Sequence, residues 1–443
     1  MDCRLCFGTG RSVHAEAEMI TSPAFSGKRF AVLGLARSGL ATVRALVESG
    51  AEVTAWDARD EARTAVPAGV QLADPLAIDL AGFDAVVVSP GVPLNRHPIA
   101  DHARAAHVPI MGDIELFAMA RPSLPPHQVV GITGTNGKST TTALIHHIVA
   151  SAGIPARLGG NIGLPILSQD PLPEGGVYVL ELSSFQIDLT HSLACDVAVL
   201  TNITPDHLDR YDSFADYAAA KERLFTLQHQ DHVAVIATED DPSRMIASRI
   251  THRLHRVAST DIADQSRWPA LQGPHNAQNI ACASAVARAL GVTDDQIETA
   301  LCSYPGLSHR MERVAERVGV LFVNDSKATN PTSTAPALAA YPRIHWILGG
   351  QAKTKDLDAC APHFGHVVAA YVIGEAGPMF ADLLRPTMTV AEAGTLERAV
   401  QLAAAAAQPG DVVLLSPACA SFDQFRDFEA RGDAFRAAVE ALS

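Results

Sequence analysis

A stretch rich in glycine, GITGTNGKSTTT at residues 131–142, has the residue types of a loop that binds phosphate. The common pattern for such loops, G-x-x-x-x-G-K-[ST], would place its first glycine at residue 132, where the sequence has isoleucine. An apolar strand precedes the stretch and a helix follows it, so backbone N–H groups at the helix start can bind phosphate. The expected contacts are Gly134, Thr135, Asn136, Gly137, Lys138, Ser139 and Thr140.

Two side chains of this stretch suit a nucleotide with its metal ion. Lys138 can neutralise the charge of the β- and γ-phosphates, and the hydroxyl group of Ser139 can reach Mg²⁺. Glu181 ends an expected strand at 176–182, and a carboxylate at a strand end beside a phosphate loop is typical of a Mg²⁺ ligand. The alternative is a glycine-rich turn with an incidental lysine.

Further candidate ligands follow the expected strand 195–203. Asp206, His207 and Asp209 lie close together in the sequence, and His207 is either a metal ligand or an ordinary loop residue. The helix that comes next begins with a predicted capping box, Ser213 with Asp216.

Lys221 falls on the apolar face of that helix, with Phe214 and Tyr217. Burial lowers the pKa of a lysine, and a neutral lysine can react with CO₂. The carbamate would be a bidentate oxygen ligand for a second Mg²⁺. The alternative is a side chain that extends along the apolar face until its ammonium group reaches water.

Asn276 and Asn279 are spaced i and i+3 at an expected helix start, where they either present two amides to an adenine or cap the helix. Arg310 lies at the junction to the last segment, from which it can reach a γ-phosphate.

The first ordered segment contains a partial dinucleotide fingerprint. Gly34 and Gly39 follow its first strand, but the middle glycine of G-x-G-x-x-G is replaced by Ala36. Asp57 lies where an acid would bind a ribose hydroxyl, and SPG at 89–91 ends another strand of the same sheet. A dinucleotide site, a site for one nucleotide's sugar and diphosphate, and a plain tight turn are all left open.

Strands alternate with helices along the whole chain, which predicts α/β domains with parallel sheets whose ligands bind at the strand C-termini. Apolar strands are expected near residues 29–33, 84–88, 127–133, 176–182, 195–203, 232–238, 320–326, 344–350, 367–374 and 412–418. The proline-rich stretch 121–127 is expected to be a connector.

With 443 residues, 48% hydrophobic and 19% charged, the chain has the composition of a globular protein of two to four domains. Its net charge of −14 disfavours nonspecific binding to nucleic acid. No apolar run approaches the roughly 18 residues of a membrane span, and the N-terminus lacks the apolar core of a signal peptide, so we expect a cytoplasmic protein.

The N-terminal stretch shows no periodicity. Residues 1–27 are expected to be disordered or a wrongly assigned start, with Met19 as an alternative start. Of seven cysteines only Cys3 and Cys6 are close, and this C-x-x-C has no second ligand pair, so reduced thiols are favoured over a zinc or redox site.

Several motifs occur together in one order: GTNGKST, ELSSFQ, TNITPDHLDRY followed by Lys221, GPHNAQN, LSHR and NDSKATNP. In this they resemble the Mur ligases of peptidoglycan synthesis, and DSKATNP and SPACASFDQF look like the D-glutamate-adding branch of that family. The resemblance covers about residues 28–440. It implies a Rossmann-like UDP-sugar domain (28–116), a central P-loop ATPase domain with a parallel sheet (117–306) and a Rossmann-like D-glutamate domain (307–443).

The resemblance also implies roles for individual residues. The UDP-sugar would contact Leu35, Ala36, Ser38, Gly39, Asp57, Ser89, Gly91 and Asn161. Catalysis would involve Lys138, Asn161, His207 and Lys221, and two Mg²⁺ ions would be held by Ser139, Glu181, His207 and carbamylated Lys221. ATP would contact the loop at 134–140 together with Asn276, Asn279, Arg310 and Asp325. D-glutamate would be held by Thr329, Lys353, Ser421 and the backbone of Phe428.

The reaction implied by the resemblance is ATP + UDP-N-acetylmuramoyl-L-alanine + D-glutamate → amide product + ADP + phosphate. We expect a monomer with no nucleic acid partner and no membrane span. Two features depart from the family pattern: the loop GGQAKTKDL around Lys353, and the residues before the first strand. An NAD-dependent dehydrogenase and a regulatory P-loop ATPase are the alternative functions.

Overall fold

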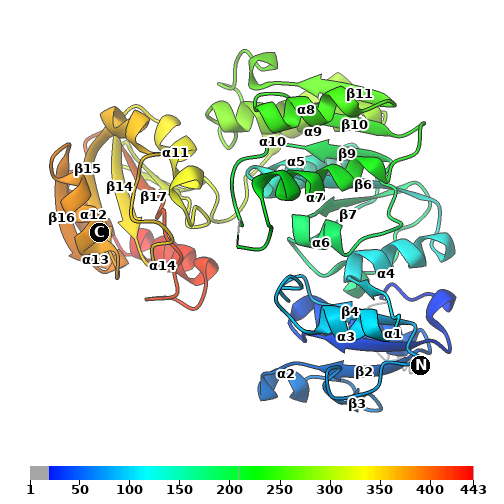
Figure 1. Cartoon of the computed structure of the whole chain (residues 1–443). Coiled ribbons are helices and arrows are strands. Elements are labelled where there is room, and N and C mark those ends of the chain that lie inside the picture. The colour runs from blue at the N-terminus through cyan, green and yellow to red at the C-terminus, as the bar shows by residue number, and fades with distance from the viewer. Residues whose placement is uncertain (1–18, 208, 443) are drawn as a thin grey trace, which may run out of the picture. The chain divides into compact units, whose positions relative to one another are not determined.

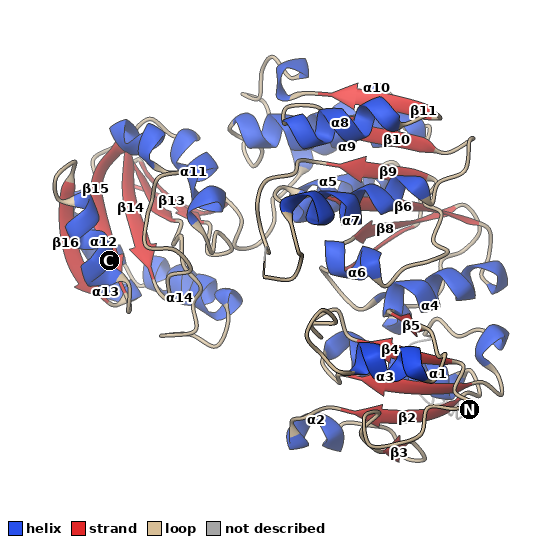
Figure 2. Cartoon of the chain, in the orientation of Figure 1, coloured by secondary structure: helices blue, strands red, loops and turns tan. Residues whose placement is uncertain are grey.

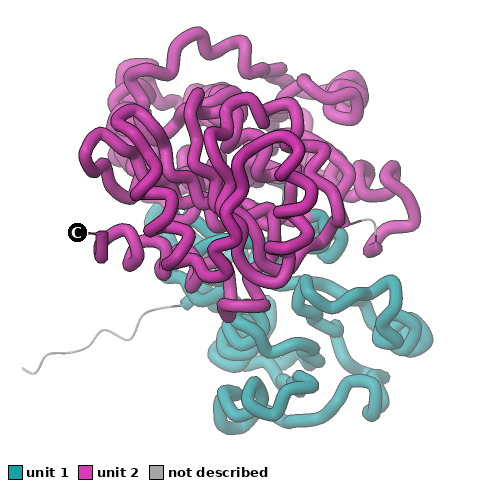
Figure 3. The backbone as a smooth tube through the Cα atoms, turned by 90° about the vertical axis from the view of Figure 1, so that its left-hand side faces the viewer, with its two compact units in different colours: residues 1–128, 157–176, 184–194 teal, residues 129–156, 177–183, 195–443 magenta. Residues whose placement is uncertain are grey.

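The computed structural model describes residues 19–207 and 209–442 (Figure 1). Contacts along the chain divide it into two compact units, coloured separately in Figure 3. One unit contains the residues up to 128 together with 157–176 and 184–194. The other contains 129–156, 177–183 and 195–443. The division into domains at 28–116, 117–306 and 307–443 stays a prediction.

The first sheet is parallel, in the strand order β3-β2-β1-β4-β5. Its strands are β1 (Arg29–Leu33), β2 (Glu52–Trp56), β3 (Gln71–Leu72), β4 (Ala85–Val88) and β5 (Ile110–Met111). The helices around it are α1 (Arg37–Glu48), α2 (Asp60–Thr64), α3 (Ile99–Ala105) and α4 (Asp113–Ala120). The order reverses between β1 and β4, so the turns after these two strands meet where such sheets bind ligands.

The segment before β1 corrects one expectation. Residues 19–27 are ordered and contain a short 3₁₀ helix, η1 (Pro23–Phe25). Ile20 and Phe25 are fully buried, and the Phe25 ring packs edge-on against Phe30 of β1 with 6.0 Å between centroids. Predicted disorder is therefore wrong for 19–27, because two apolar side chains anchor this segment. Residues 1–18, with Cys3 and Cys6, lie outside the described residues.

The central sheet has the order β11-β10-β9-β6-β8-β7, and β6, β9, β10 and β11 run parallel. Its strands are β6 (His127–Thr133), β7 (Ala156–Gly160), β8 (Gly176–Glu181), β9 (Val197–Leu200), β10 (Val233–Ala237) and β11 (Arg253–Val257). Its helices are α5 (Lys138–Ser151), α6 (Ser184–Asp188), α7 (Phe214–Thr226), α8 (Asp241–Arg249), α9 (Pro274–Ala289) and α10 (Asp294–Ser303). The predicted central parallel sheet is confirmed.

The last sheet is mixed, in the order β12-β13-β17-β14-β15-β16. Its strands are β12 (Glu312–Arg317), β13 (Val320–Asn324), β14 (Ile344–Gly349), β15 (Val367–Ile373), β16 (Thr389–Gly394) and β17 (Val412–Leu415). Within the described residues β12 pairs antiparallel with β13, and the other strand pairs of this sheet are parallel. Strand β12 was not predicted, because its sequence ERVAER is largely charged, as is common for a strand at a sheet edge.

Helices lie on both faces of this last sheet (Figure 2). They are α11 (Pro331–Ala339), α12 (Gly377–Leu384), α13 (Leu396–Ala406) and α14 (Phe428–Glu440). Alternate strand residues separate two apolar cores: Trp346 of β14 packs with Leu338 and Phe380, whereas its neighbour Ile347 packs with Val400 and Phe435. Both faces of the sheet are therefore buried, as parallel strands require.

Within residues 19–207 and 209–442, no helix combines the length and the apolar character needed to cross a lipid bilayer.

Gly39 in the first turn of α1 gives a testable constraint on the fold. A Cβ atom added at Gly39 would lie 1.9 Å from the backbone oxygen of Gly34, so the turn after β1 would have to move. We expect Gly39→Ala to lower the thermal unfolding midpoint by roughly 4 °C or more, measured by calorimetry. Gly91→Ala is the matched control, since no atom lies within 4 Å of a Cβ atom added there. Equal midpoints for the two variants would contradict this assignment.

Candidate active site

The predicted phosphate loop joins β6 to α5, so its strand–loop–helix context is confirmed. Two glycines in the loop have backbone angles that favour glycine, with φ of +146° at Gly134 and +81° at Gly137. A Cβ atom at Gly134 would lie 2.0 Å from Thr201 Oγ1, and one at Gly137 would lie 2.5 Å from Asn279 Oδ1. Both glycines are needed because neighbouring side chains approach the loop backbone closely.

The end of β9 holds this loop in place. The N–H group of Thr135 donates to the backbone oxygen of Asn202 (2.8 Å), and the N–H group of Asn136 donates to Asn202 Oδ1 (2.9 Å). The Thr201 hydroxyl donates to the Asn136 oxygen (2.7 Å). Sequence reasoning did not assign Thr201 or Asn202, although both belong to the quoted motif TNITPDHLDRY. The loop is thus preorganised by its own chain.

Lys138 lies against the loop that it follows. Its Nζ donates to the backbone oxygens of Gly134 (3.0 Å) and Thr135 (2.8 Å). Burial lowers the pKa of Lys138, the carboxylate of Glu181 opposes that shift, and the charge of Arg310 adds to it. Arg310 also donates to the Ser139 hydroxyl oxygen (2.8 Å), so two cations lie at the start of α5.

The surroundings of Lys221 exclude one of the two alternatives that the sequence left open for this side chain. Of the predicted capping box, the N-cap contact is confirmed, since Ser213 Oγ accepts from the backbone N–H of Asp216 (3.2 Å). The Asp216 carboxylate accepts from the Ser213 hydroxyl (2.6 Å). The Lys221 side chain is 1% exposed, its Nζ donates to the Gly134 oxygen (2.8 Å), and it lies 4.5 Å from the centre of the Tyr217 ring. The alternative in which the ammonium group of Lys221 reaches water is therefore wrong, because the phosphate loop covers this face of α7.

Two further candidates share this charged neighbourhood. Glu181 ends β8 and is 1% exposed. His207 is half-exposed, has a φ of +52°, and its Nε2 lies 3.6 Å from Asp206 Oδ2. Burial lowers the pKa of His207, as do the positive charges of Lys353, Lys138 and Lys221, while Asp206 opposes the shift. The imidazole is thus neutral near pH 7 and able to accept a proton.

The chemistry of these donors fits a hard divalent cation. Ser139, Glu181 and His207 supply a hydroxyl, a carboxylate and an imidazole. No group of three or more His, Cys, Asp or Glu side chains in the described ranges could hold a metal ion. As an amine donating to Gly134, Lys221 is no ligand, and only a carbamate would make it one. Mg²⁺ here would need phosphate oxygens, water or that carbamate as further ligands.

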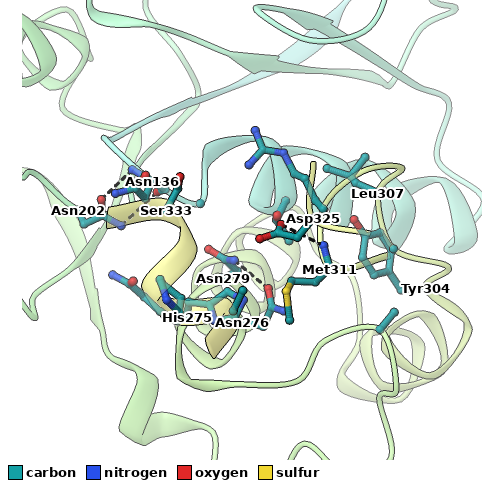
Figure 4. A pocket seen from close by; sticks show the side chains of 18 residues that line it. Asn136, Asn202, His275, Asn276, Asn279, Tyr304, Leu307, Met311, Asp325 and Ser333 are labelled. Carbon is teal, nitrogen blue, oxygen red and sulfur yellow. Dashed lines mark hydrogen bonds between the residues drawn. The ribbon is translucent and has the colours of Figure 1, made fainter. Parts of the chain in front are cut away.

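A pocket opens beside the loop, shown in Figure 4. Asn279 Nδ2 donates to Asn276 Oδ1 (3.1 Å), and Asn276 Nδ2 donates to the Gln272 oxygen (3.0 Å). Helix capping is wrong for both asparagines, because the N-cap of α9 is Gly273 and no side chain caps it. The residues that line the pocket include Asn136, Gly137, Thr140, Asn276, Asn279, Arg310 and Asp325, all predicted to contact ATP.

Asp325 follows β13 and is 6% exposed. The Ser416 hydroxyl donates to its Oδ2 (2.7 Å) and the N–H group of Met311 donates to its Oδ1 (3.3 Å). Burial raises the pKa of Asp325 to about 7, against the lowering effect of the Ser416 hydrogen bond and the Arg310 charge. The carboxyl group of Asp325 therefore titrates near neutral pH.

The residues predicted to hold D-glutamate lie in loops of the last sheet. Ser421 is buried, and Phe428 starts α14, where its oxygen accepts from the Ser326 hydroxyl (2.8 Å). Thr329 is partly buried. Lys353 is exposed and lines a second cavity together with Thr135, Asp206 and Asn330.

Two cations of this region were missed by sequence reasoning. Lys327 Nζ lies 3.8 Å from the centre of the Phe428 ring, and burial, with the charge of Arg310, lowers the pKa of Lys327 to about 8. The buried Arg431 guanidinium donates to Ser326 and to the oxygens of Cys419 and Ala420, and so holds the loops before Ser421. The available signal for Lys327 was its position in the loop that follows the C-terminal end of β13.

The turn after β1 belongs to the other unit and is described by itself. The N–H group of Leu35 donates to Asp57 Oδ2 (2.8 Å), and the Ser89 hydroxyl donates to the Gly34 oxygen (2.9 Å). Burial alone would raise the pKa of Asp57, but hydrogen bonds from Arg59 and backbone N–H groups outweigh it and hold the pKa at about 2. Ala36 is the N-cap of α1, Ser38 and Gly39 lie in the first turn of that helix, and Gly91 lies in the turn after β4.

Asn161 follows β7 in the same unit. Arg37 of α1 donates from Nη2 to the oxygen of Gly163 (2.8 Å), two residues beyond Asn161. The loop with Asn161 is thereby tied to the helix that carries Ser38 and Gly39.

Family models match three parts of the chain: "Mur ligase MurD-like, N-terminal domain" at residues 28–112, "Mur ligase middle domain" at 132–272 and "Mur ligase, glutamate ligase domain" at 309–419. The chain belongs to the Mur ligase family, a family of ATP-dependent ligases with this three-domain α/β architecture.

Two similar relatives of the chain carry the same enzyme name. The chain is 68% identical over 432 residues, 96% of its length, to the whole UDP-N-acetylmuramoylalanine–D-glutamate ligase of Sphingopyxis alaskensis. It is 60% identical over 440 residues, again 96% of its length, to the whole enzyme of that name from Zymomonas mobilis.

Solved structures share the fold at low identity. UDP-N-acetylmuramate-alanine ligase MurC of Thermotoga maritima has a TM-score of 0.58 at 17% identity, covering 94% of this chain and 99% of that one. MurF of Acinetobacter baumannii has a TM-score of 0.58 at 18% identity, covering 94% of this chain and 92% of that one.

Asp325 gives a pH test of the geometry. Its folded pKa of about 7 lies above the ordinary value of 3.8, so the folded chain binds this proton more tightly than the unfolded chain. The stabilisation is complete below pH 3.8 and is lost as pH rises to about 7. We expect wild type to lose stability relative to Asp325→Asn between pH 5 and pH 8, measured by urea unfolding. A stability difference that is the same at both pH values would contradict the assigned shift.

Proposed function

We propose that this chain is the ATP-dependent ligase that adds D-glutamate to UDP-N-acetylmuramoyl-L-alanine. The observation that carries the proposal is the cluster of Lys138, Lys221 and Arg310 around one glycine loop, in a chain of the Mur ligase family. The relatives named for this reaction support the choice of substrates.

The first step makes the substrate carboxyl group a better acyl donor. A carboxylate oxygen of the alanyl group attacks the γ-phosphorus of ATP, the bond from phosphorus to the β–γ bridging oxygen breaks, and ADP leaves. Lys138 and Arg310 would offset the charge on the phosphate oxygens. Both are held at the start of α5 before any substrate binds, so little reorganisation is needed.

The second step forms the amide. The amine of D-glutamate attacks the acyl carbon, the bond from that carbon to the phosphate oxygen breaks, and phosphate leaves while the amine loses a proton. His207 is a candidate acceptor when its acceptor nitrogen binds no metal ion, because its lowered pKa keeps it neutral, and released phosphate is the other candidate. Lys353, Lys327 and Ser421 supply two charges and a hydroxyl that would fix the two carboxylates of D-glutamate.

Ser139 and Glu181 would hold one Mg²⁺, and His207 with the carbamate of Lys221 would hold a second. When bound, the metal would withdraw charge from phosphate and acyl oxygens. Leu35, Ala36, Ser38, Gly39, Asp57, Ser89, Gly91 and Asn161 would bind the UDP-sugar. Action as a cytoplasmic monomer stays a prediction.

Release of phosphate with each substrate omitted in turn tests the reaction. We expect release only when ATP, UDP-N-acetylmuramoyl-L-alanine and D-glutamate are all present, because the acyl phosphate is consumed by the amine. Release that is independent of D-glutamate would favour a regulatory ATPase. Nicotinamide binding in a fluorescence titration would favour a dehydrogenase.

Lys221→Ala tests the carbamate. We expect the variant to lose activity by at least about 100-fold, because the loop loses a donor at Gly134 and the second Mg²⁺ its anionic ligand. Acetate or bicarbonate should restore part of the activity by supplying a carboxylate in the space that the side chain leaves. Full activity without additive would contradict the carbamate.

A further inference from the structure

Most polar side chains of the pocket beside the loop already have protein partners. The Thr141 hydroxyl donates to Asn279 Oδ1 (3.1 Å), Asn279 Nδ2 donates to Asn276 Oδ1, and Asn276 Nδ2 donates to the Gln272 oxygen. Gln278 donates to the Thr201 oxygen. This chain of contacts fixes the amides and leaves each with only part of its hydrogen-bonding capacity for a ligand.

Two other polar groups of the same pocket have no hydrogen-bond partner within the described chain. Tyr304, at the end of α10, is 7% exposed, and its buried hydroxyl has no hydrogen-bond partner among the described residues. His275, in the first turn of α9, has a buried Nδ1 that likewise lacks a partner within the described chain. Buried polar groups are nearly always paired, so two exceptions lining one pocket point to a ligand.

The lining of the pocket combines two chemically different kinds of group. Asn136, Gly137 and Thr140 of the phosphate loop line it, with Arg310. Apolar side chains also line the pocket, together with the amide and carboxyl groups named above: Ala270, Leu307, Met311, Pro336 and Ala337. A phosphate chain suits the loop residues and Arg310, and a flat heterocycle with its sugar suits the apolar side chains.

Figure 4 shows His275 and Tyr304 on opposite sides of the pocket, with Asn276 and Asn279 between them. We propose that Tyr304 and His275 hydrogen-bond the nucleoside half of the nucleotide, and thereby help to determine which nucleotide the ligase accepts. This assignment rests on the proposed function only in that a nucleotide occupies this pocket.

The protonation states suit a neutral nucleoside. Burial lowers the pKa of His275 to about 4, so the imidazole is uncharged near pH 7 and offers one donor and one acceptor. Burial raises the pKa of the Tyr304 phenol well above its usual value, so the hydroxyl keeps its proton and can donate.

Calorimetric titration of the full chain with ADP and with inorganic tripolyphosphate tests the assignment. Tyr304→Phe removes one oxygen and keeps the ring, so we expect the Kd for ADP to rise about three- to tenfold, with the Kd for tripolyphosphate unchanged. His275→Phe should behave in the same way. Titrations with 2′-deoxy-ADP, 3′-deoxy-ADP and purine riboside diphosphate separate the ribose from the base: the variant's loss disappears for the analogue that lacks the contacted group.

Tyr371→Phe is the matched control, since that hydroxyl contacts His345 and does not line the pocket. It should leave the Kd for ADP unchanged. An unchanged ADP affinity in both pocket variants would overturn the assignment, and so would an equal loss for tripolyphosphate, which would indicate a distorted loop. Failure of the wild-type chain to bind ADP would contradict the nucleotide site and the proposed function together.

Discussion

The backbone oxygen of Gly134 accepts hydrogen bonds from two lysines, Lys138 at 3.0 Å and Lys221 at 2.8 Å. Two ammonium groups removed from bulk water repel each other, and their burial is costly unless negative charge lies nearby. Glu181 supplies part of that charge. A bound phosphate chain would supply the rest, so the same contact that shapes the loop creates its affinity for an anion. Gly134 must be glycine for this arrangement, because Thr201 approaches it so closely.

The sheets explain why these groups meet. β9, β6 and β8 are neighbours, and the phosphate loop, Glu181 and the segment 201–207 follow their C-terminal ends. In the last sheet Asp325, Lys353 and Ser421 lie in the loops after β13, β14 and β17, which are also neighbours. Ligand-binding residues at one edge of a parallel sheet follow directly from that topology. Loops can thus carry the chemistry while the buried strands keep them in place.

Sequence patterns were sufficient for the elements with strong local signals. The long apolar strands, the phosphate loop with its helix and the Ser213 cap follow from period, glycine and capping rules. The burial of the Lys221 side chain could not be predicted in this way, because it depends on Gly134, which is 87 residues away along the chain. The packing of Phe25 on Phe30, the charged edge strand β12 and the partners of the two asparagines are likewise set by tertiary contacts. Local patterns do not contain that information.

The central claim is that phosphate leaves ATP for a carboxylate and not for water. Isotope transfer measures this most directly: UDP-N-acetylmuramoyl-L-alanine labelled with ¹⁸O in its alanyl carboxylate is converted with ATP and D-glutamate, and the phosphate formed is analysed by ³¹P NMR. An acyl phosphate predicts one ¹⁸O atom from the carboxylate in each phosphate released. Phosphate without the label, with its new oxygen drawn from water, would contradict the account.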